Sequence, residues 1–183
     1  MDGGRSYHGA GPKVEAQMSE LDRRRIVAAP RAEDTRAVGR RLGALAAPGT
    51  VFLLTGPLGA GKTTFVAGLG EGLGAAGRAT SPTFVLVREH PPIAGGGPAL
   101  VHVDLYRLAG AAEVIPLALD EFVDGGAVMA VEWADRGPVP EGPTTVRIDF
   151  QVAGEGRRLV MDASGPQAAT LMAAATHAEA AGE

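Results

Sequence analysis

The sequence contains no cysteine among its 183 residues. Disulfide bonds and thiolate metal sites are therefore excluded. Long apolar runs are also missing, since no stretch approaches the roughly 18 apolar residues that a membrane-spanning helix needs. The opening residues, MDGGRSYHGAGPK, lack the apolar segment of a secretory signal peptide. We therefore expect a cytoplasmic protein with no membrane contact.

Lysine and net positive charge are also scarce. The formal net charge is −4, and only two of the 17 basic residues are lysines, Lys13 and Lys62. No global positive field is available to hold a nucleic acid unaided, so any contact with RNA requires a local patch or a partner protein. Because lysine is so rare here, Lys62 is not explained by bulk charge and needs a local reason.

Hydrophobic periodicity predicts strands that alternate with helices. Strands are expected at 25–28, 50–55, 83–88, 99–104 and 127–132, helices at 33–46 and 62–73, and a helical segment at 111–122 that Pro116 breaks. Two further strands, at 145–152 and 157–161, flank a Gly-containing turn and predict a late antiparallel hairpin. This order indicates an α/β three-layer sandwich with a mixed, mainly parallel sheet.

One domain is expected at residues 25–165. Residues 1–24 are rich in glycine and polar groups and are interpreted as a disordered N-terminal tail. Residues 166–183 are interpreted as an Ala-rich C-terminal tail, either a weak helix or a frayed end.

The stretch GPLGAGKTT follows a predicted strand and opens a predicted helix. Gly56, Gly61, Lys62 and Thr63 match G-x-x-x-x-G-K-[ST], the pattern of a phosphate-binding P-loop. Glycines let the backbone curl so that N–H groups point at phosphate oxygens, and the helix directs its positive end at the same place. Lys62, expected on the solvent side of the loop, would add a charge for the β- and γ-phosphates, and the Thr63 hydroxyl can ligate Mg²⁺. The pattern therefore predicts a P-loop NTPase-type fold; the alternative is a glycine-rich turn that happens to contain Lys and Thr.

Two acids end apolar strands downstream of this loop. Asp104 ends LVHVD and Glu132 ends AVMAVE, at the edge of a parallel sheet where ligands bind in such folds. Acids at these places can hold Mg²⁺ or orient a water molecule; otherwise each is a carboxylate that caps its own loop. His102 alternates onto the face of Asp104, where it either orients that carboxylate or simply packs.

Two further residues have open interpretations. Thr83, in SPTF, either senses a γ-phosphate, as switch threonines do, or belongs to a simple turn. Trp133 is the only tryptophan, and it is either a core residue or an anchor for a partner. The other histidines have no acid or histidine cluster around them in the sequence, so no zinc site is expected.

Four motifs occur in order along the chain: GPLGAGKTTF, SPTF, HVDLYRL and VEWADR. With this set the sequence resembles the TsaE family (formerly YjeE), small bacterial P-loop ATPases, over about residues 26–161. The resemblance implies binding of ATP or ADP with Mg²⁺ and weak ATP hydrolysis. It also implies a role in forming N6-threonylcarbamoyladenosine in tRNA with TsaB and TsaD, which carry out the threonylcarbamoyl transfer, and contact with tRNA through that complex.

The resemblance also implies a role for each matching residue. Lys62, Asp104 and Glu132 would be catalytic, with Asp104 orienting or activating the attacking water. Thr63 and Glu132 would ligate Mg²⁺, and the segment 31–35 would border the adenine. The nucleotide would be held by Gly59, Ala60, Gly61, Lys62, Thr63, Thr64, Thr83 and Trp133.

Two other functions fit the same motifs. A small-molecule kinase would share the P-loop and a strand-end acid, but it usually needs an arginine-bearing lid. The arginines here are scattered, and the candidates to face the site are Arg107, Arg136, Arg157 and Arg158. A non-hydrolytic, nucleotide-gated adaptor would carry identical motifs. Replacing Glu132 or Asp104 separates hydrolysis from gating, because an adaptor would keep its function.

Overall fold

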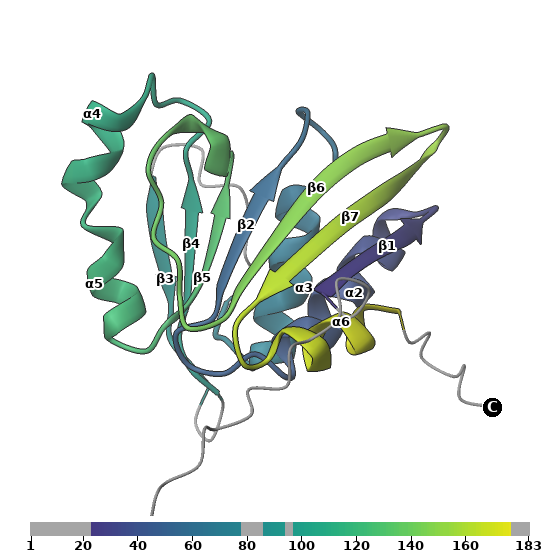
Figure 1. Ribbon diagram of the computed structural model, residues 1–183, viewed down its shortest axis with the longest axis horizontal. Helices are drawn as coiled ribbons and strands as arrows, with labels where there is room; N and C mark the ends of the chain where they lie inside the picture. Colours follow the sequence, from purple (N-terminus) through teal and green to yellow (C-terminus); the bar gives the residue numbers. More distant parts are fainter. Residues whose placement is uncertain (1–22, 78–85, 94–96, 177–183) are drawn as a thin grey trace, which may run out of the picture.

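The computed structural model describes residues 23–77, 86–93 and 97–176. Their strands form one seven-stranded sheet in the order β1-β7-β6-β2-β5-β4-β3 (Figure 1). The strands are β1 (Arg24–Ala29), β2 (Val51–Thr55), β3 (Val87–His90), β4 (Leu100–Asp104), β5 (Val128–Glu132), β6 (Thr145–Ala153) and β7 (Gly156–Ser164). The α-helices are α2 (Ala32–Gly43), α3 (Lys62–Leu73), α4 (Ala111–Val114), α5 (Leu119–Asp124) and α6 (Ala168–Thr176), and two 3₁₀ turns are η1 (Ile115–Leu117) and η2 (Ala134–Arg136).

The sheet is mixed, as predicted. β2 pairs in parallel with both β5 and β6, and β5 pairs in parallel with β4. β3 is antiparallel to β4, and β7 is antiparallel to both β6 and β1. Because β1 and β6 are both antiparallel to β7, they point the same way as the central strands, and β6 and β7 form the predicted late hairpin.

Helices cover both faces of the sheet, which makes the three layers (Figure 1). One core joins α2, α3 and α6 to the sheet, and it contains the rings of Phe52, Phe65 and Phe150. The other core joins α4 and α5 to the opposite face of β2, β4 and β5. These three strands are buried along nearly their whole length, as strands between two helical layers must be.

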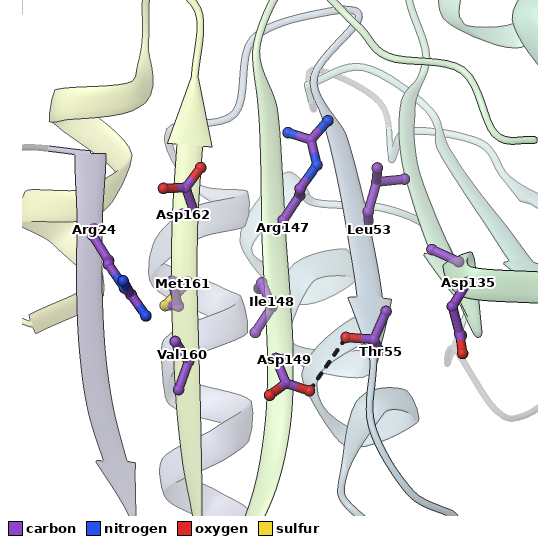
Figure 2. Close-up of a pocket in the computed structure, with 11 residues that line it drawn as sticks. Arg24, Leu53, Thr55, Asp135, Arg147, Ile148, Asp149, Val160, Met161 and Asp162 are labelled. Atoms are coloured by element: carbon purple, nitrogen blue, oxygen red, sulfur yellow. Dashed lines mark hydrogen bonds between the residues drawn. The ribbon is translucent and has the colours of Figure 1, made fainter. Parts of the chain in front are cut away.

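The hairpin and β1 extend past the layer of α4 and α5 (Figure 1). On this outer face lies a hollow of about 360 Å³, in which Arg24, Asp162 and Arg147 stand side by side on three neighbouring strands (Figure 2). At its other end the Thr55 hydroxyl donates a hydrogen bond to Asp149 Oδ1 at 3.3 Å. Of the predicted site residues that the structure describes, none lines this hollow.

The helices α2 and α3 approach each other until their backbones touch. A Cβ atom at Gly68 of α3 would lie 2.0 Å from the carbonyl oxygen of Arg36, and one at Gly39 of α2 would lie 2.2 Å from that of Phe65. The same holds one turn further along each helix, at Gly43 and Gly72. Two G-x-x-x-G patterns therefore face each other and fix the distance between α2 and the helix that follows the P-loop.

The chain after residue 165 is not a frayed tail within the described residues. α6 buries Ala168, Leu171, Met172 and Ala175 in the core shared with α2 and α3. These positions follow the i, i+3, i+4, i+7 spacing of an amphipathic helix. The domain therefore continues to Thr176, beyond the boundary expected at 165. Residues 177–183 and residues 1–22 lie outside the described ranges.

Another boundary differs from expectation. The strand expected at 83–88 is seen as β3 (Val87–His90), and residues 83–85 lie outside the described part of the chain. The helical segment around Pro116 is divided into α4, η1 and α5, as the proline predicted. Within the described ranges, no helix combines the length and apolarity that crossing a membrane requires.

Candidate functional site

The glycine-rich loop joins the end of β2 to the start of α3. Gly56 has a φ of 123° and lies against the backbone of Phe150, where a Cβ atom would be 2.4 Å from the carbonyl oxygen. Gly61 has a φ of 103° and immediately precedes the first residue of α3. Side chains are disfavoured at both positions, so the glycines are required for the curl. The helix that follows directs its unpaired N–H groups and its positive end toward the loop.

Lys62 lies inside the site, not on its solvent side. The residue is only 4% exposed, and Nζ donates hydrogen bonds to the carbonyl oxygens of Gly56 at 2.7 Å and Pro57 at 3.0 Å. Nζ also lies 3.8 Å from the centroid of the Trp133 ring. Burial lowers the pKa of the Lys62 amine, and the nearby Glu132 carboxylate counteracts part of this shift. The expectation that Lys62 lies on the solvent side of the loop was wrong, because the sequence does not reveal that the Trp133 ring covers its amine.

Thr63 and Glu132 meet across the site. The Thr63 hydroxyl lies 2.8 Å from Glu132 Oε1 and 3.1 Å from Oε2 and donates to this carboxylate. Glu132 is 3% exposed. The two residues predicted to ligate Mg²⁺ are therefore in direct contact, although 69 positions separate them in the sequence.

His102 contacts Glu132 and not Asp104. Its Nε2 lies 2.9 Å from Glu132 Oε1, and its side chain is fully buried. The parallel register of β4 and β5 explains this, because His102 pairs with Ala130 and Glu132 is two residues further along the same face. Alternation along one strand showed the correct face, but only the pairing of the two strands shows the partner.

Asp104 lies beside Glu132 at the same edge of the sheet, because the two residues are paired in register. Its Oδ1 accepts a hydrogen bond from the backbone N–H of Tyr106 at 3.0 Å. Asp104 thus shapes the loop that follows β4 and also lines the hollow above the P-loop. The two sequence-based interpretations of this acid, loop cap and site residue, are compatible.

Trp133 roofs the site from a left-handed backbone conformation, with a φ of 59°. Its ring lies 4.9 Å from that of Tyr106 and 5.6 Å from the guanidinium of Arg136, centroid to Cζ in the second case. It is half-buried and packs partly against the core. Sequence reasoning did not select Tyr106, although the tyrosine belongs to the quoted HVDLYRL motif.

These residues enclose a pocket of about 230 Å³. It is lined by Leu58, Gly59, Ala60, Gly61, Lys62, Thr63, Thr64, Asp104, Tyr106, Glu132 and Trp133. All the predicted site residues therefore come together except Thr83, which lies outside the described residues.

A second hollow, of about 300 Å³, lies on the other side of the loop and shares Gly59, Gly61 and Thr64 with the first. Thr35 of α2 lines it, and the Thr35 hydroxyl is buried and has no hydrogen-bond partner among the residues that the structure describes. Arg157, from the start of β7, donates from Nη2 to the Gly59 carbonyl at 3.1 Å. The start of α2, predicted to border an adenine, is thus next to the loop.

The four candidate arginines do not converge as a lid would require. Arg136 lies near the Trp133 ring and Arg157 contacts the loop, as described above. Arg107 and Arg158 line neither hollow, and Arg158 bonds to Gln151 on the hairpin.

The side chains present suit Mg²⁺, which phosphates and water help to hold, better than they suit a metal ion that is held by protein side chains alone. In the described part of the chain, no three His, Cys, Asp or Glu side chains gather as a metal cluster would. Mg²⁺ is usually held by one or two carboxylates together with substrate phosphates and water. The Thr63 hydroxyl and the Glu132 carboxylate, beside a loop whose sequence matches a phosphate-binding pattern, are this kind of donor set.

The fold and the loop define a class, the α/β proteins of P-loop NTPase type. Within that class, the chain belongs to the TsaE family. The family model described as "Threonylcarbamoyl adenosine biosynthesis protein TsaE" matches residues 29–160.

Relatives and a solved structure agree with this assignment. The tRNA threonylcarbamoyladenosine biosynthesis protein TsaE of Streptomyces coelicolor is 46% identical over 141 residues, which cover 74% of this chain and 94% of the relative. The protein of the same name from Bacillus subtilis is 44% identical over 102 residues, covering 56% and 61%. A crystal structure of Bacillus subtilis YdiB is similar with a TM-score of 0.63 and 30% identity, and the match covers 84% of this chain and 94% of that one.

Proposed function

We propose that this protein binds ATP with Mg²⁺, hydrolyses it slowly, and serves the formation of N6-threonylcarbamoyladenosine in tRNA. One observation carries the proposal. Lys62, Thr63 and Glu132 meet around one pocket at the carboxyl edge of the parallel strands, with Asp104 beside them. Membership in the TsaE family supports the same function.

The P-loop binds the phosphates. The N–H groups at the start of α3 and the Lys62 amine face the same pocket, so they hold the β- and γ-phosphates of ATP or ADP. Thr35 and the second hollow accommodate the nucleoside, because a buried hydroxyl with no partner among the described residues is available there. Trp133 covers Lys62 and keeps bulk water away from it.

Thr63 and Glu132 ligate Mg²⁺, and Asp104 orients the attacking water. Bound Mg²⁺ neutralises the charge that develops on the phosphates during transfer. Asp104 lies in register with Glu132, one strand further from the loop, at a place from which a carboxylate can accept a proton from water. Thr83 is proposed to lie near the γ-phosphate, on the family resemblance alone.

The partners are TsaB and TsaD, in the cytoplasm. The transfer of the threonylcarbamoyl group belongs to them, and this chain supplies an ATP-driven step. Tyr106 is 44% exposed and Leu58 is 73% exposed at the rim of the pocket, so apolar surface is available there for a partner that senses the nucleotide.

The test is ATP hydrolysis by the pure protein with Mg²⁺, alone and with TsaB and TsaD from the same source, with Glu132→Ala measured beside it. We expect a low rate alone, a changed rate with the partners, and loss of hydrolysis with retained ATP binding in the variant. A rate that ignores the partners would leave a generic P-loop ATPase. Full support of tRNA modification by the Glu132→Ala variant without hydrolysis would show a nucleotide-gated adaptor.

A further inference from the structure

His102 is buried beside the residues proposed to hold Mg²⁺, and the proposed function gives it no role. It lies on β4, fully buried, with Nε2 2.9 Å from Glu132 Oε1. Its other ring nitrogen, Nδ1, has no hydrogen-bond partner among the described residues. A buried polar group needs a hydrogen-bond partner, and the partner of His102 is the carboxylate proposed to hold the metal, so the contact acts directly on that carboxylate.

The contact decides which nitrogen carries the proton. An ionised carboxylate only accepts hydrogen bonds. Nε2 must therefore be the N–H that donates to Glu132, and neutral His102 has its lone pair on Nδ1. The opposite tautomer would bury an N–H without a partner and place two acceptors 2.9 Å apart, and both features cost free energy.

The contact also distinguishes the two oxygens of Glu132. Oε1 lies 2.9 Å from His102 Nε2 and 2.8 Å from the Thr63 hydroxyl, whereas the side-chain contact of Oε2 is with Thr63, at 3.1 Å. If the Thr63 oxygen becomes a metal ligand, Thr63 leaves its present hydrogen bond to Glu132. His102, by contrast, has no other hydrogen-bond partner in the described part of the chain. His102 therefore holds Oε1, and the carboxylate keeps one rotation, with Oε2 available to the pocket.

We propose that His102 is a positioning residue for the magnesium site: by donating from Nε2 to Oε1, it orients the Glu132 carboxylate so that Oε2 faces the metal. The inference rests on the proposed function, because it concerns the metal that accompanies the nucleotide. Side chains that orient a metal ligand typically affect metal affinity about 10- to 100-fold when they are removed.

The test compares His102→Leu, which removes the donor, with His102→Gln, whose amide can donate from nearly the same place. Calorimetry measures ADP binding in EDTA and then the Mg²⁺ concentration that half-saturates the linked change in ADP affinity. For His102→Leu we expect that Mg²⁺ concentration to rise about 10- to 100-fold, with ADP affinity in EDTA unchanged. For His102→Gln we expect a value near that of the unmodified protein, which a merely structural effect on the fold would not produce.

A second measurement does not depend on how the variants fold. In the metal-free protein, ¹⁵N NMR of the imidazole should show His102 protonated at Nε2 and bare at Nδ1. A bare Nε2, with the proton on Nδ1 alone, would overturn the inference, and so would equal Mg²⁺ dependence in His102→Leu and the unmodified protein, or a His102→Gln variant as impaired as His102→Leu. If the unmodified protein itself shows no Mg²⁺-linked nucleotide binding, the proposed function fails and takes the inference with it.

Discussion

Lys62 places its amine in a buried position, where the charged form is disfavoured. Burial lowers the pKa of its amine, yet two loop carbonyls and the Trp133 ring hold Nζ at the pocket. Lys62→Met keeps an unbranched side chain that is one atom shorter, and removes the charge. We expect ATP affinity to fall at least about tenfold, since a hydrogen bond to a charged group contributes about 1.5–3 kcal/mol, and we expect thermal stability to stay within about 1 kcal/mol because the buried charge is also removed.

Arg158→Met is the matched control for this experiment. It removes the same charge from an exposed position on the hairpin that lines neither hollow. We expect it to leave ATP affinity unchanged in calorimetry. Equal affinity in Lys62→Met and the unmodified protein would mean that the loop does not bind the phosphates.

His90 makes the stability of the protein depend on pH in a predictable direction. Burial lowers the pKa of its imidazole below 6.5, its ordinary value, although the hydrogen bond to the Ala76 carbonyl opposes the shift. A lowered pKa in the folded state means that the unfolded chain binds the proton first. The stability that the neutral ring contributes is therefore complete above pH 6.5 and is lost as the pH falls below 6.5 toward the folded pKa.

His90→Gln tests this direction, because glutamine can still reach the carbonyl but does not titrate. We expect the melting temperature of the unmodified protein to drop more between pH 7.5 and pH 5.5 than that of the variant. Parallel curves for the two proteins would show that His90 titrates as freely in the fold as it does in the unfolded chain.

Sequence reasoning found most of the site because its chemistry is local. Lys62 and Thr63 belong to one short pattern, and Asp104 and Glu132 each end a readable strand. The interactions that depend on pairing between distant segments were not readable. The partner of His102 follows from the register of two strands, and the Trp133 ring lies over Lys62 from a residue in a left-handed backbone conformation.

At the scale of elements, the spacing between α2 and α3 is fixed by glycine. A Cβ atom at Gly68 would lie 2.0 Å from a backbone carbonyl of α2. A Gly→Ala change in an open helix usually stabilises by about 0.5–1 kcal/mol, but here the helices must separate. We expect Gly68→Ala to lower the free energy of unfolding by roughly 1–3 kcal/mol, and to weaken ATP binding because α3 carries Lys62 and Thr63.

Gly70→Ala, in the same helix, is the control. Its Cβ atom would meet the end of the Leu100 side chain, at 3.2 Å, and that side chain can shift. Denaturant unfolding should place Gly70→Ala within about 1 kcal/mol of the unmodified protein. Similar stability for both variants would mean that the close approach of the two backbones is not a constraint on the fold.

Helices and strands were predictable where the pattern of apolar residues is strong and long. The helix after the P-loop and the two acid-ending strands were placed correctly. α6 was left undecided because alanine occupies two of its four buried positions, so the apolar spacing has little contrast with the Ala-rich sequence around it. The facing glycines of α2 and α3 were overlooked for a related reason: in a chain with 27 glycines, spacing of four residues carries little information by itself.

For the whole molecule, the site lies where the two cores meet. β2, β4 and β5 are held between the two helical layers, so the loop and both acids lie at the ends of strands that are buried along nearly their whole length. Thr63 is presented by α3, and Asp104 ends β4, a strand that contributes side chains to both cores. The site therefore depends on the packing of α3 against β4 and β5, and movement of α3 relative to the sheet would disturb it.

The overall charge of the protein affects how tightly it can bind tRNA. The formal net charge is −4, and Arg23–Arg25 is the longest run of basic residues in the sequence. We expect the protein alone to bind labelled tRNA weakly, without saturation up to about 10 µM at 150 mM salt. The physical reason is that few phosphates are neutralised, and the affinity that each one provides falls with salt along a log–log slope of about −0.7 to −0.9.

Fluorescence anisotropy between 50 and 200 mM salt measures this tRNA binding, with and without TsaB and TsaD, and we expect tight binding only with the partners. Tight, steeply salt-dependent binding by the protein alone would contradict the expectation. Its loss on replacing Arg23, Arg24 and Arg25 with alanine would then locate the RNA contact at β1, on the edge of the sheet far in the strand order from Asp104.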